Sequence, residues 1–436
     1  MIWWIYNVLF GIGFVLMLPK FLLRMRKRGG YSRDFGQRLG RYRYEVFEKL
    51  TEQRRVWIHA VSVGELFVAL KLMERWREAR PEARFVVSVT TSTGYALAEK
   101  RLDPRDVVIY FPVDFPPVVS KVLGMIKPLA LVMVEVEWWP NLIRQARGRG
   151  IPVALVNGRV SERSFRGYKR VGMFTRRLLP ELNVLCVQSE GDGQKLVALG
   201  AEPEQVVVTG SAKYDIAAGD LGSKAGPDVR GLLDAAGITR DRKILLGGST
   251  WPGEEEALLD VYKSLKTRHR DLALVLAPRH VERVPEILEL LKRSAKPFVR
   301  RSEVKAGQGL KSGPADVFLL DTTGELASFY GEADVIFVGK SLTQHGGQNI
   351  LEPAAFARPV VVGPNMENFQ SITRDFLDAG ALVQVPDLQN LRRAVDDLLY
   401  NDDKRRLLGE AAAQVIKQRQ GALDRTLAAV LKECGV

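Results

Sequence analysis

Two rounds of alternation between short apolar, β-branched runs and longer amphipathic stretches constrain the fold of this chain more than any other feature. The apolar runs of the first round cover residues 56–59, 85–89, 107–110, 129–136, 153–156 and 184–187. Those of the second round cover residues 243–247, 273–277, 317–320, 335–338 and 360–362. Such alternation is typical of a parallel sheet whose two faces are covered by helices. The sequence therefore predicts an α/β fold built twice.

The segments around these rounds indicate how the domains are divided. At 436 residues the chain exceeds the size at which a single core stops growing. Residues 217–228 are rich in Gly, Ala and Asp and lack a strand pattern, which is typical of a linker. Residues 388–434 have a helical pattern throughout. We expect two Rossmann-like domains facing a cleft, at residues 29–215 and 216–415, and a closing or crossover helix at residues 416–436.

The first 28 residues form a candidate membrane anchor with a basic flank. Residues 1–23 are almost wholly apolar, include Trp3 and Trp4, and run into a basic stretch that starts at Arg24. A secretory signal peptide has its basic residues first, so we expect this segment to be retained. A basic flank favours the cytoplasmic side for the rest of the chain. Spanning and interfacial insertion both stay open, because the run is close to the minimum length for crossing and contains Pro19. The alternative is a buried core helix.

The net charge of +13 predicts an anionic partner, which includes nucleic acid, anionic lipid headgroups and phosphorylated substrates. The excess is concentrated in two clusters: Arg24, Arg26, Lys27, Arg28, Arg33, Arg38, Arg41 and Arg43, and then Arg159, Arg163, Arg166, Lys169 and Arg170. Cys186 and Cys434 are the two cysteines, too few for a disulfide framework or a thiolate metal site.

Carboxylates follow two predicted strands of the first half, where open α/β sheets bind ligands. Glu65 lies in the first turn of the helix expected after residue 62. A carboxylate there stays ionised and can accept a proton, although the helix dipole alone also explains it. Glu135 lies near the end of the run at 129–136 and Glu137 follows it directly, and an alternation of period two puts both side chains on one face. They are candidates for binding sugar hydroxyls, and surface salt bridges are the alternative.

Candidate phosphate-binding groups follow strands of the second half. Ser249 and Thr250 come after a glycine pair and before an acidic helix start, so backbone amides can approach an anion there. No Lys follows the glycines as a P-loop requires. Arg279 follows the next strand and is suited to pairing with a phosphate. The run from Gly346 to Glu352 combines glycines with a carboxylate that can bind a ribose diol, although helix capping also explains part of it.

Taken together, these segments resemble the 3-deoxy-D-manno-octulosonic acid (Kdo) transferase family, and the resemblance covers most of the chain. It is carried by residues 36–40, 59–65, 111–114, 135–141, 157–161, 188–189, 209–213, 248–250, 278–280, 324–326 and 346–354. It implies the GT-B glycosyltransferase fold and an inverting transfer of Kdo from CMP-Kdo to a lipid A precursor, without cofactor or metal. It also implies the cytoplasmic face of the inner membrane, with the basic clusters facing the membrane and lipid phosphates rather than nucleic acid.

The resemblance implies specific roles. Glu65 would be the catalytic base, and Glu137 a second acidic residue on the acceptor side. The donor site would comprise Ser249, Thr250, Arg279, Gly324, Glu325, Gly346, Gly347, Asn349 and Glu352. Ser62, Gly64, Arg159 and Lys213 would line the acceptor side. The chain departs from the family at Trp251 and Gln348, where the family often has His, and at Lys340, where it has Gly-Gly or Gly-Ser.

Two other functions fit parts of the sequence. The first is a GT-B transferase or an epimerase that uses a UDP-sugar, which a comparison of CMP with UDP binding would distinguish. The second is a membrane-tethered scaffold that binds polyanions, which predicts salt-dependent binding and indifference to nucleotides.

Overall fold

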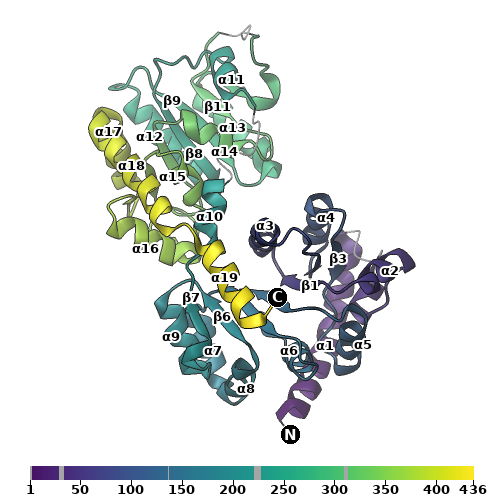
Figure 1. Ribbon diagram of the computed structural model, residues 1–436. Coiled ribbons are helices and arrows are strands. Elements are labelled where there is room, and N and C mark those ends of the chain that lie inside the picture. The colour runs from purple at the N-terminus through teal and green to yellow at the C-terminus, as the bar shows by residue number, and fades with distance from the viewer. Residues whose placement is uncertain (1, 29–33, 136, 220–226, 309–312) are drawn as a thin grey trace. The chain divides into compact units, whose positions relative to one another are not determined.

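The computed structural model describes residues 2–28, 34–135, 137–219, 227–308 and 313–436, with side chains from residue 20 to residue 28 left out. The chain forms two compact units, Met1–Ile216 with Gln420–Val436, and Ala217–Arg419 (Figure 1). The basic side chains of the flank at residues 24–28, together with Arg33, lie outside this description.

The first unit is built on a seven-stranded sheet with the order β3-β2-β1-β4-β5-β6-β7. Its paired strands are parallel, as predicted. The bounds are β1 Val56–Ala60, β2 Phe85–Val89, β3 Val107–Tyr110, β4 Leu131–Val134, β5 Val153–Gly158, β6 Val184–Val187 and β7 Val206–Val208. The prediction missed β7, whose three residues are too few for a recognisable pattern. The predicted strand at residues 129–136 is also longer at both ends than β4, which covers Leu131–Val134. Residue 136 itself lies outside the described residues.

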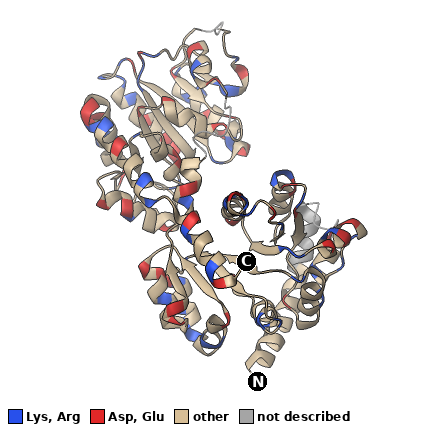
Figure 2. Ribbon diagram, in the orientation of Figure 1, with Lys and Arg blue, Asp and Glu red and all other residues tan. Residues whose placement is uncertain are grey.

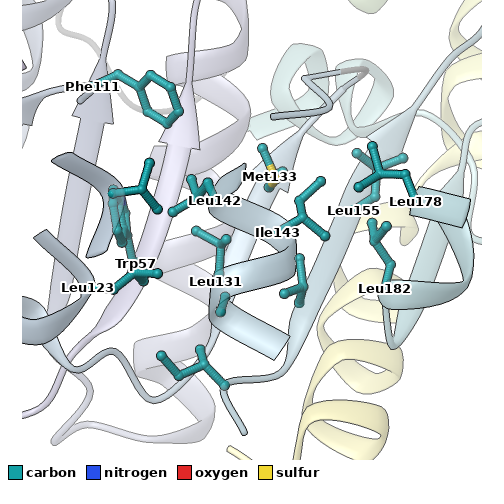
Figure 3. Packing of buried hydrophobic residues seen from close by; sticks show 14 of the residues in the cluster. Trp57, Phe111, Leu123, Leu131, Met133, Leu142, Ile143, Leu155, Leu178 and Leu182 are labelled. Atoms are coloured by element: carbon teal, nitrogen blue, oxygen red, sulfur yellow. The ribbon is translucent and has the colours of Figure 1, made fainter. Parts of the chain in front are cut away.

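Helices cover both faces of this sheet, and alternate residues of each strand contact opposite layers. Trp57 packs in one core cluster (Figure 3), whereas Val56 and Ile58 pack in the other. The helices are α1 Ile2–Arg28, α2 Tyr44–Glu52, α3 Val63–Ala79, α4 Ser92–Arg101, α5 Pro116–Ile126, α6 Pro140–Arg147, α7 Glu162–Arg170, α8 Gly172–Leu178, α9 Glu190–Leu199, α10 Ala212–Gly219 and α19 Ala422–Cys434. Short 3-10 turns are η1 Phe35–Leu39, η2 Leu179–Glu181 and η3 Pro203–Gln205. The C-terminal α19 contacts α3, β5 and β6, so it completes the core of the first unit.

The second unit contains another seven-stranded parallel sheet, with the order β10-β11-β9-β8-β12-β13-β14. Its strands are β8 Ile244–Thr250, β9 Ala273–Pro278, β10 Phe298–Arg300, β11 Val317–Leu319, β12 Val335–Val338, β13 Val360–Val362 and β14 Val383–Gln384. Its helices are α11 Val229–Ala235, α12 Glu254–Leu265, α13 Val284–Ser294, α14 Leu326–Phe329, α15 Leu351–Ala355, α16 Gln370–Asp378, α17 Leu388–Tyr400 and α18 Asp402–Arg419, with 3-10 turns η4 Val281–Arg283, η5 Arg301–Glu303, η6 Tyr330–Glu332 and η7 Glu367–Phe369. Leu245, Leu274 and Val335 pack under α12 and α17.

The segments between and after the sheets differ in detail from the sequence prediction. The predicted linker at residues 217–228 begins inside α10, which continues to Gly219, and residues 220–226 lie outside the described residues. The helical pattern predicted over residues 388–434 is confirmed. It is divided into α17, α18 and α19 by short breaks at Asn401 and at Gln420–Gly421.

The N-terminal helix α1 is the one helix among the described residues that is long and apolar enough to cross a membrane. That judgement rests on the length and composition of Ile2–Pro19, and a signal sequence near an N-terminus meets the same criterion. Much of this segment is exposed, including Trp4, Leu9, Ile12, Val15 and Leu16. The buried core helix that the sequence left open does not fit these exposures.

The prediction that the basic clusters face the membrane and the lipid phosphates requires their side chains to be exposed. Lys and Arg residues occur mainly on helices and loops of both units (Figure 2). Four of the second cluster are exposed on α7, namely Arg163, Arg166, Lys169 and Arg170. Arg38 is buried instead, where its guanidinium donates to the Thr90 carbonyl and lies 4.5 Å from the centre of the Tyr110 ring. The prediction is therefore wrong for Arg38, because its charge is used inside the unit.

Candidate active site

Each sheet has a point near its middle at which the strand order reverses. This point lies between β1 and β4 in the first unit and between β8 and β12 in the second. Open α/β sheets bind ligands beyond the carboxyl ends of the strands at such a point. Glu65 follows β1, Glu137 follows β4, Thr250 ends β8 and Lys340 follows β12. The sheet topology therefore marks the regions that the sequence analysis selected.

Glu65 is fixed at the N-terminus of α3, as expected. The Ser62 hydroxyl accepts a hydrogen bond from the Glu65 amide at 3.2 Å, and the Glu65 carboxylate accepts one from the Ser62 amide at 3.3 Å. This reciprocal arrangement is a capping box. The Val61 amide donates to the other carboxylate oxygen at 2.7 Å. The carboxylate is therefore buried, oriented and close to the positive end of the helix dipole. Gly64 lies in the same first turn, and the acceptor-side roles of Ser62 and Gly64 stay predictions.

The structure brings three carboxylates and two cations of the first unit into one electrostatic cluster. Burial, followed by the charges of Glu65 and Glu135, raises the pKa of Glu137 to about 7. Burial also raises the pKa of Glu135, which Lys213 and Arg159 oppose. Burial lowers the pKa of Lys213, while Glu135 and Glu65 favour its charged form. We call Glu65, Glu135, Glu137, Arg159 and Lys213 the carboxylate cluster.

The prediction that Glu135 and Glu137 lie on one face of a β-strand is wrong, because both residues come after the strand has ended. Strand β4 ends at Val134, and Glu135 adopts a left-handed backbone with φ of 61°. Its amide still donates to the Val156 carbonyl at 2.9 Å. A residue other than Gly in this conformation is strained, and such strain concentrates at functional sites. The turn, rather than the pleat, directs Glu135 toward the cluster.

We expect the Glu137→Gln variant to have a flatter dependence of thermal stability on pH than the wild type. The folded-state pKa of Glu137 is raised to about 7, so between pH 5 and pH 7 the folded chain binds more protons than the unfolded chain. Stability therefore falls as the pH rises through this window, and Gln cannot lose a proton. The variant should match the wild type at pH 5 and melt about 2 °C or more higher at pH 8. A difference in melting temperature that is constant from pH 5 to pH 8 would contradict this.

In the second unit, the ends of β8 and β12 meet closely at the carboxyl edge of the sheet. A Cβ atom on Gly339 would clash with the Ser249 carbonyl oxygen, so this approach requires glycine. Ser249 and Lys340 both have left-handed backbones, with φ of 54° and 57°. The Thr250 carbonyl accepts the Arg279 amide at 3.1 Å, so these predicted donor residues lie together.

Two side chains at this edge are available for a ligand. Thr250 is buried, and its hydroxyl has no hydrogen-bond partner in the part of the chain that the structure describes. Arg279 is exposed, and its side chain forms no ion pair with any described residue. An unpaired hydroxyl and an unpaired guanidinium at a strand edge are suited to an anionic ligand.

Glu254 organises this edge, a role that the sequence analysis missed. Its buried carboxylate accepts hydrogen bonds from the amides of Trp251 at 2.9 Å, Lys340 at 2.8 Å, Ser341 at 3.0 Å and Leu342 at 3.0 Å. The loop after β12 is thus tied to the start of α12. The sequence shows three consecutive glutamates in the first turn of α12, and no local signal separates Glu254 from the next two.

Two of the departures from the family pattern contact each other. The Lys340 ammonium lies 4.5 Å from the centre of the Trp251 ring, within the range of a cation–π interaction. The Trp251 ring is 5.2 Å from the His280 ring. Gln348, the third departure, is half-buried in the loop that follows. The replacements at Trp251 and Lys340 therefore form a single packed pair beside Thr250.

The remaining predicted donor residues take part in local interactions. Gly324 has φ of 87°, and the Glu325 carboxylate after it accepts hydrogen bonds from Arg301 at 2.9 Å and from the Thr322 hydroxyl. The Gly346 amide donates to Glu367 at 2.7 Å, and the Gly347 amide donates to the Lys340 carbonyl at 2.8 Å.

Asn349 and Glu352 belong to the start of α15. The Asn349 side-chain oxygen accepts the Leu351 amide at 3.1 Å, and its amide group donates to Glu352 at 3.2 Å. This geometry fits the capping explanation, and the exposed Glu352 carboxylate stays a predicted ligand for a ribose.

No group of three or more His, Cys, Asp or Glu side chains that could hold a metal ion occurs among the described residues. That the transfer reaction requires neither a metal ion nor a cofactor stays a prediction.

Comparison with known proteins assigns both units to glycosyltransferases. Residues 33–216 match the family described as 3-Deoxy-D-manno-octulosonic-acid transferase (kdotransferase), and residues 303–415 match glycosyl transferases group 1. A solved structure, UDP-GlcNAc 2-epimerase from Neisseria meningitidis bound to UDP-GlcNAc, aligns with a TM-score of 0.59 over 87% of this chain and 100% of its own. At 13% identity this likeness shows the fold alone, which is the GT-B type predicted from the sequence.

Sequence relatives extend over nearly the whole chain. The chain is 32% identical over 398 residues to a 3-deoxy-D-manno-octulosonic acid transferase of Haemophilus influenzae, with 91% of each chain covered. It is 33% identical over 384 residues to another from Bordetella pertussis, with 86% of each covered. The identity and coverage confirm the predicted resemblance: the chain belongs to the 3-deoxy-D-manno-octulosonic acid (Kdo) transferase family of glycosyltransferases.

Proposed function

We propose that this protein transfers Kdo from CMP-Kdo to a hydroxyl of a lipid A precursor, with inversion at the anomeric carbon, in lipopolysaccharide synthesis. The observation that carries the proposal is the identity to Kdo transferases over 91% of both chains. The carboxylate cluster of the first unit and the anion-suited edge of the second unit supply the two kinds of group that such a transfer needs.

Glu65 is proposed to act as the general base. Its carboxylate already accepts two backbone hydrogen bonds, and a carboxylate has about four lone-pair positions, so it retains capacity to accept a proton. The acceptor oxygen forms a bond to the anomeric carbon of Kdo while the bond from that carbon to the phosphate oxygen breaks. The hydroxyl proton passes to Glu65, and the bonding electrons leave with CMP.

Glu137 and Lys213 are proposed to assist on the acceptor side. A neighbouring carboxylate with a pKa of about 7 is partly protonated at neutral pH, so Glu137 can donate a hydrogen bond to an acceptor oxygen. Lys213 and Arg159 place positive charge beside the carboxylates and so favour binding of an anionic acceptor.

The second unit is proposed to hold CMP through Ser249, Thr250, Arg279, the Gly324–Glu325 turn and the loop from Gly346 to Glu352. Arg279 and backbone amides would stabilise the charge on the departing phosphate without a metal ion. We also propose that α1 keeps the protein at the cytoplasmic face of the inner membrane. The apolar composition of α1 supports attachment to a membrane, and the basic stretch that starts at Arg24 favours the cytoplasmic side.

We expect the Arg279→Ala variant to bind CMP about tenfold more weakly than the wild type, because a charge-assisted hydrogen bond to phosphate contributes about 1.5–3 kcal/mol. Calorimetric titration with CMP measures this change. Arg240→Ala is the matched control, since Arg240 is also exposed but precedes β8 at the opposite edge of the sheet. Equal affinities in the two variants would remove Arg279 from the donor site.

The proposed reaction is tested by following release of CMP from CMP-Kdo with and without the lipid acceptor. We expect release that depends on the acceptor. A parallel incubation with a UDP-sugar addresses the alternative donor: UDP release in the absence of any CMP release would favour the UDP-sugar enzyme instead.

A further inference from the structure

A largely apolar cavity of about 270 Å³ lies within the first unit, between α1 and the loop that follows β3. Phe10, Phe14 and Leu18 line it from α1, and Phe111, Val113 and Trp139 line it from the body of the unit. None of the groups assigned to Kdo transfer above lines this cavity, so it needs a separate explanation.

Polar contacts hold α1 in the position that creates the cavity. The Tyr6 hydroxyl donates to the Asp114 carboxylate at 2.9 Å, and the Asn141 side chain donates to Asn7 at 2.7 Å. Asp114 is buried, and it also accepts the backbone amides of Asn141 at 3.0 Å and Leu142 at 2.9 Å. These contacts tie the first turns of α1 to the N-terminus of α6. The cavity is therefore enclosed between α1 and the rest of the first unit, to which α1 is bound by these contacts.

The cavity is continuous with an exposed apolar surface. Met17 lines the cavity and is nevertheless 59% exposed, so the cavity reaches the surface beside α1. The outer side of the same helix exposes Leu9, Ile12 and Leu16, within the segment that has the composition of a membrane helix. These apolar side chains give an apolar chain an entrance to the cavity, whose lining is mostly apolar but also includes Arg38, Thr90 and Asp114.

At its inner end the cavity adjoins the carboxylate cluster. Thr90 lines the cavity, and its hydroxyl donates to the Val61 carbonyl at 3.1 Å. The amide of the same Val61 donates to the Glu65 carboxylate at 2.7 Å. Trp139, another lining residue, follows Glu137 by two positions. The lining of the cavity is therefore separated from the proposed base by a single residue, Val61.

We propose that this cavity binds one acyl chain of the lipid acceptor, so that the sugar hydroxyl of the same molecule reaches Glu65. The inference rests on the proposed function. An acylated sugar has an apolar tail joined to a polar head, which is the order in which the cavity and the carboxylate cluster occur. Burial of each methylene group favours binding about fourfold, so occupancy should make the KM for acceptor depend on acyl length.

A pair of variants on α1 tests the proposal with acceptors that share one sugar head and carry long or short acyl chains. Leu18→Trp fills the cavity, whereas Leu16→Trp adds the same bulk at a side chain that is 73% exposed. We expect Leu18→Trp to raise the KM for the long-chain acceptor about tenfold and to leave kcat and the short-chain KM unchanged. The Leu16→Trp variant should behave like the wild type. Identical long-chain KM values in the two variants would overturn the proposal.

Two further measurements separate other outcomes. If Leu18→Trp loses binding to phospholipid vesicles while its dependence on acyl length is unchanged, bilayer lipid occupies the cavity and the proposal is wrong. Absence of Kdo transfer by the wild type would instead refute the proposed function. In that case, crosslinking with an acceptor that carries a photoreactive acyl chain still tests whether the cavity binds this chain. Labels within residues 10–18 and 111–113 would support binding in the cavity, and labels elsewhere would overturn the proposal.

Discussion

Replacement of Glu65 by Gln is expected to lower the turnover of Kdo transfer by about 10²–10⁴-fold, the contribution that a positioned general base makes. Gln cannot take the proton from the attacking hydroxyl. It does retain the shape of the side chain, and a capping box accepts Gln as well as Glu at this position. The variant should therefore keep the contacts of α3 with Ser62 and remain folded.

The control for this prediction is Glu78→Gln, which makes the same chemical change on the same helix at a side chain that is 63% exposed. Steady-state transfer rates and melting temperatures of the two variants are compared. A Glu65→Gln variant that turns over within a few-fold of the wild type would show that another group accepts the proton. A large fall in melting temperature would show that the loss of activity arises from the cap instead.

Replacement of Glu254 by Ala is expected to destabilise the second unit by at least about 3 kcal/mol and to abolish binding of CMP. Four backbone amides lose their common acceptor, and each buried donor left unpaired costs about 1–3 kcal/mol. Release of the loop after β12 would also displace Ser341 and the glycines beyond it, so the effect should reach the donor site.

Urea unfolding and CMP titration measure the two effects of this change. Glu256→Ala is the matched control, because Glu256 lies in the same first turn of α12 and is exposed. We expect this control to change stability by less than about 0.5 kcal/mol, as surface substitutions usually do. Similar unfolding midpoints for Glu254→Ala and Glu256→Ala would contradict the role assigned to Glu254.

The sequence alone was sufficient to predict the features of the fold that repeat along the chain. The alternation of apolar runs predicted two parallel sheets, because strands buried on both faces are apolar at nearly every position. The position of Glu65 was also predictable, since a capping Ser three residues before a Glu is a local signal. Short or edge strands such as β7 and β14 lacked enough residues to show a pattern.

Features that depend on tertiary contacts were not predictable. The left-handed turn at Glu135 depends on how β4 ends beside β5, and the run of apolar residues there suggested a longer strand. Glu254 acquires its role from amides almost 90 positions later in the chain. Arg38 looks like part of a basic patch in the sequence, yet it is buried against Tyr110 and Thr90. In each case the deciding partner is distant in sequence.

The central claim is that the protein transfers Kdo from CMP-Kdo to a lipid A precursor. The most direct test is to incubate the detergent-solubilised protein with both substrates and to measure the mass of the lipid product by mass spectrometry. We predict a product heavier by one or more Kdo units with the wild type, and unmodified lipid with Glu65→Gln. A protein that is folded and binds CMP but leaves the lipid unmodified would contradict the claim. It would direct attention to the Trp251–Lys340 pair as the feature that selects a different donor.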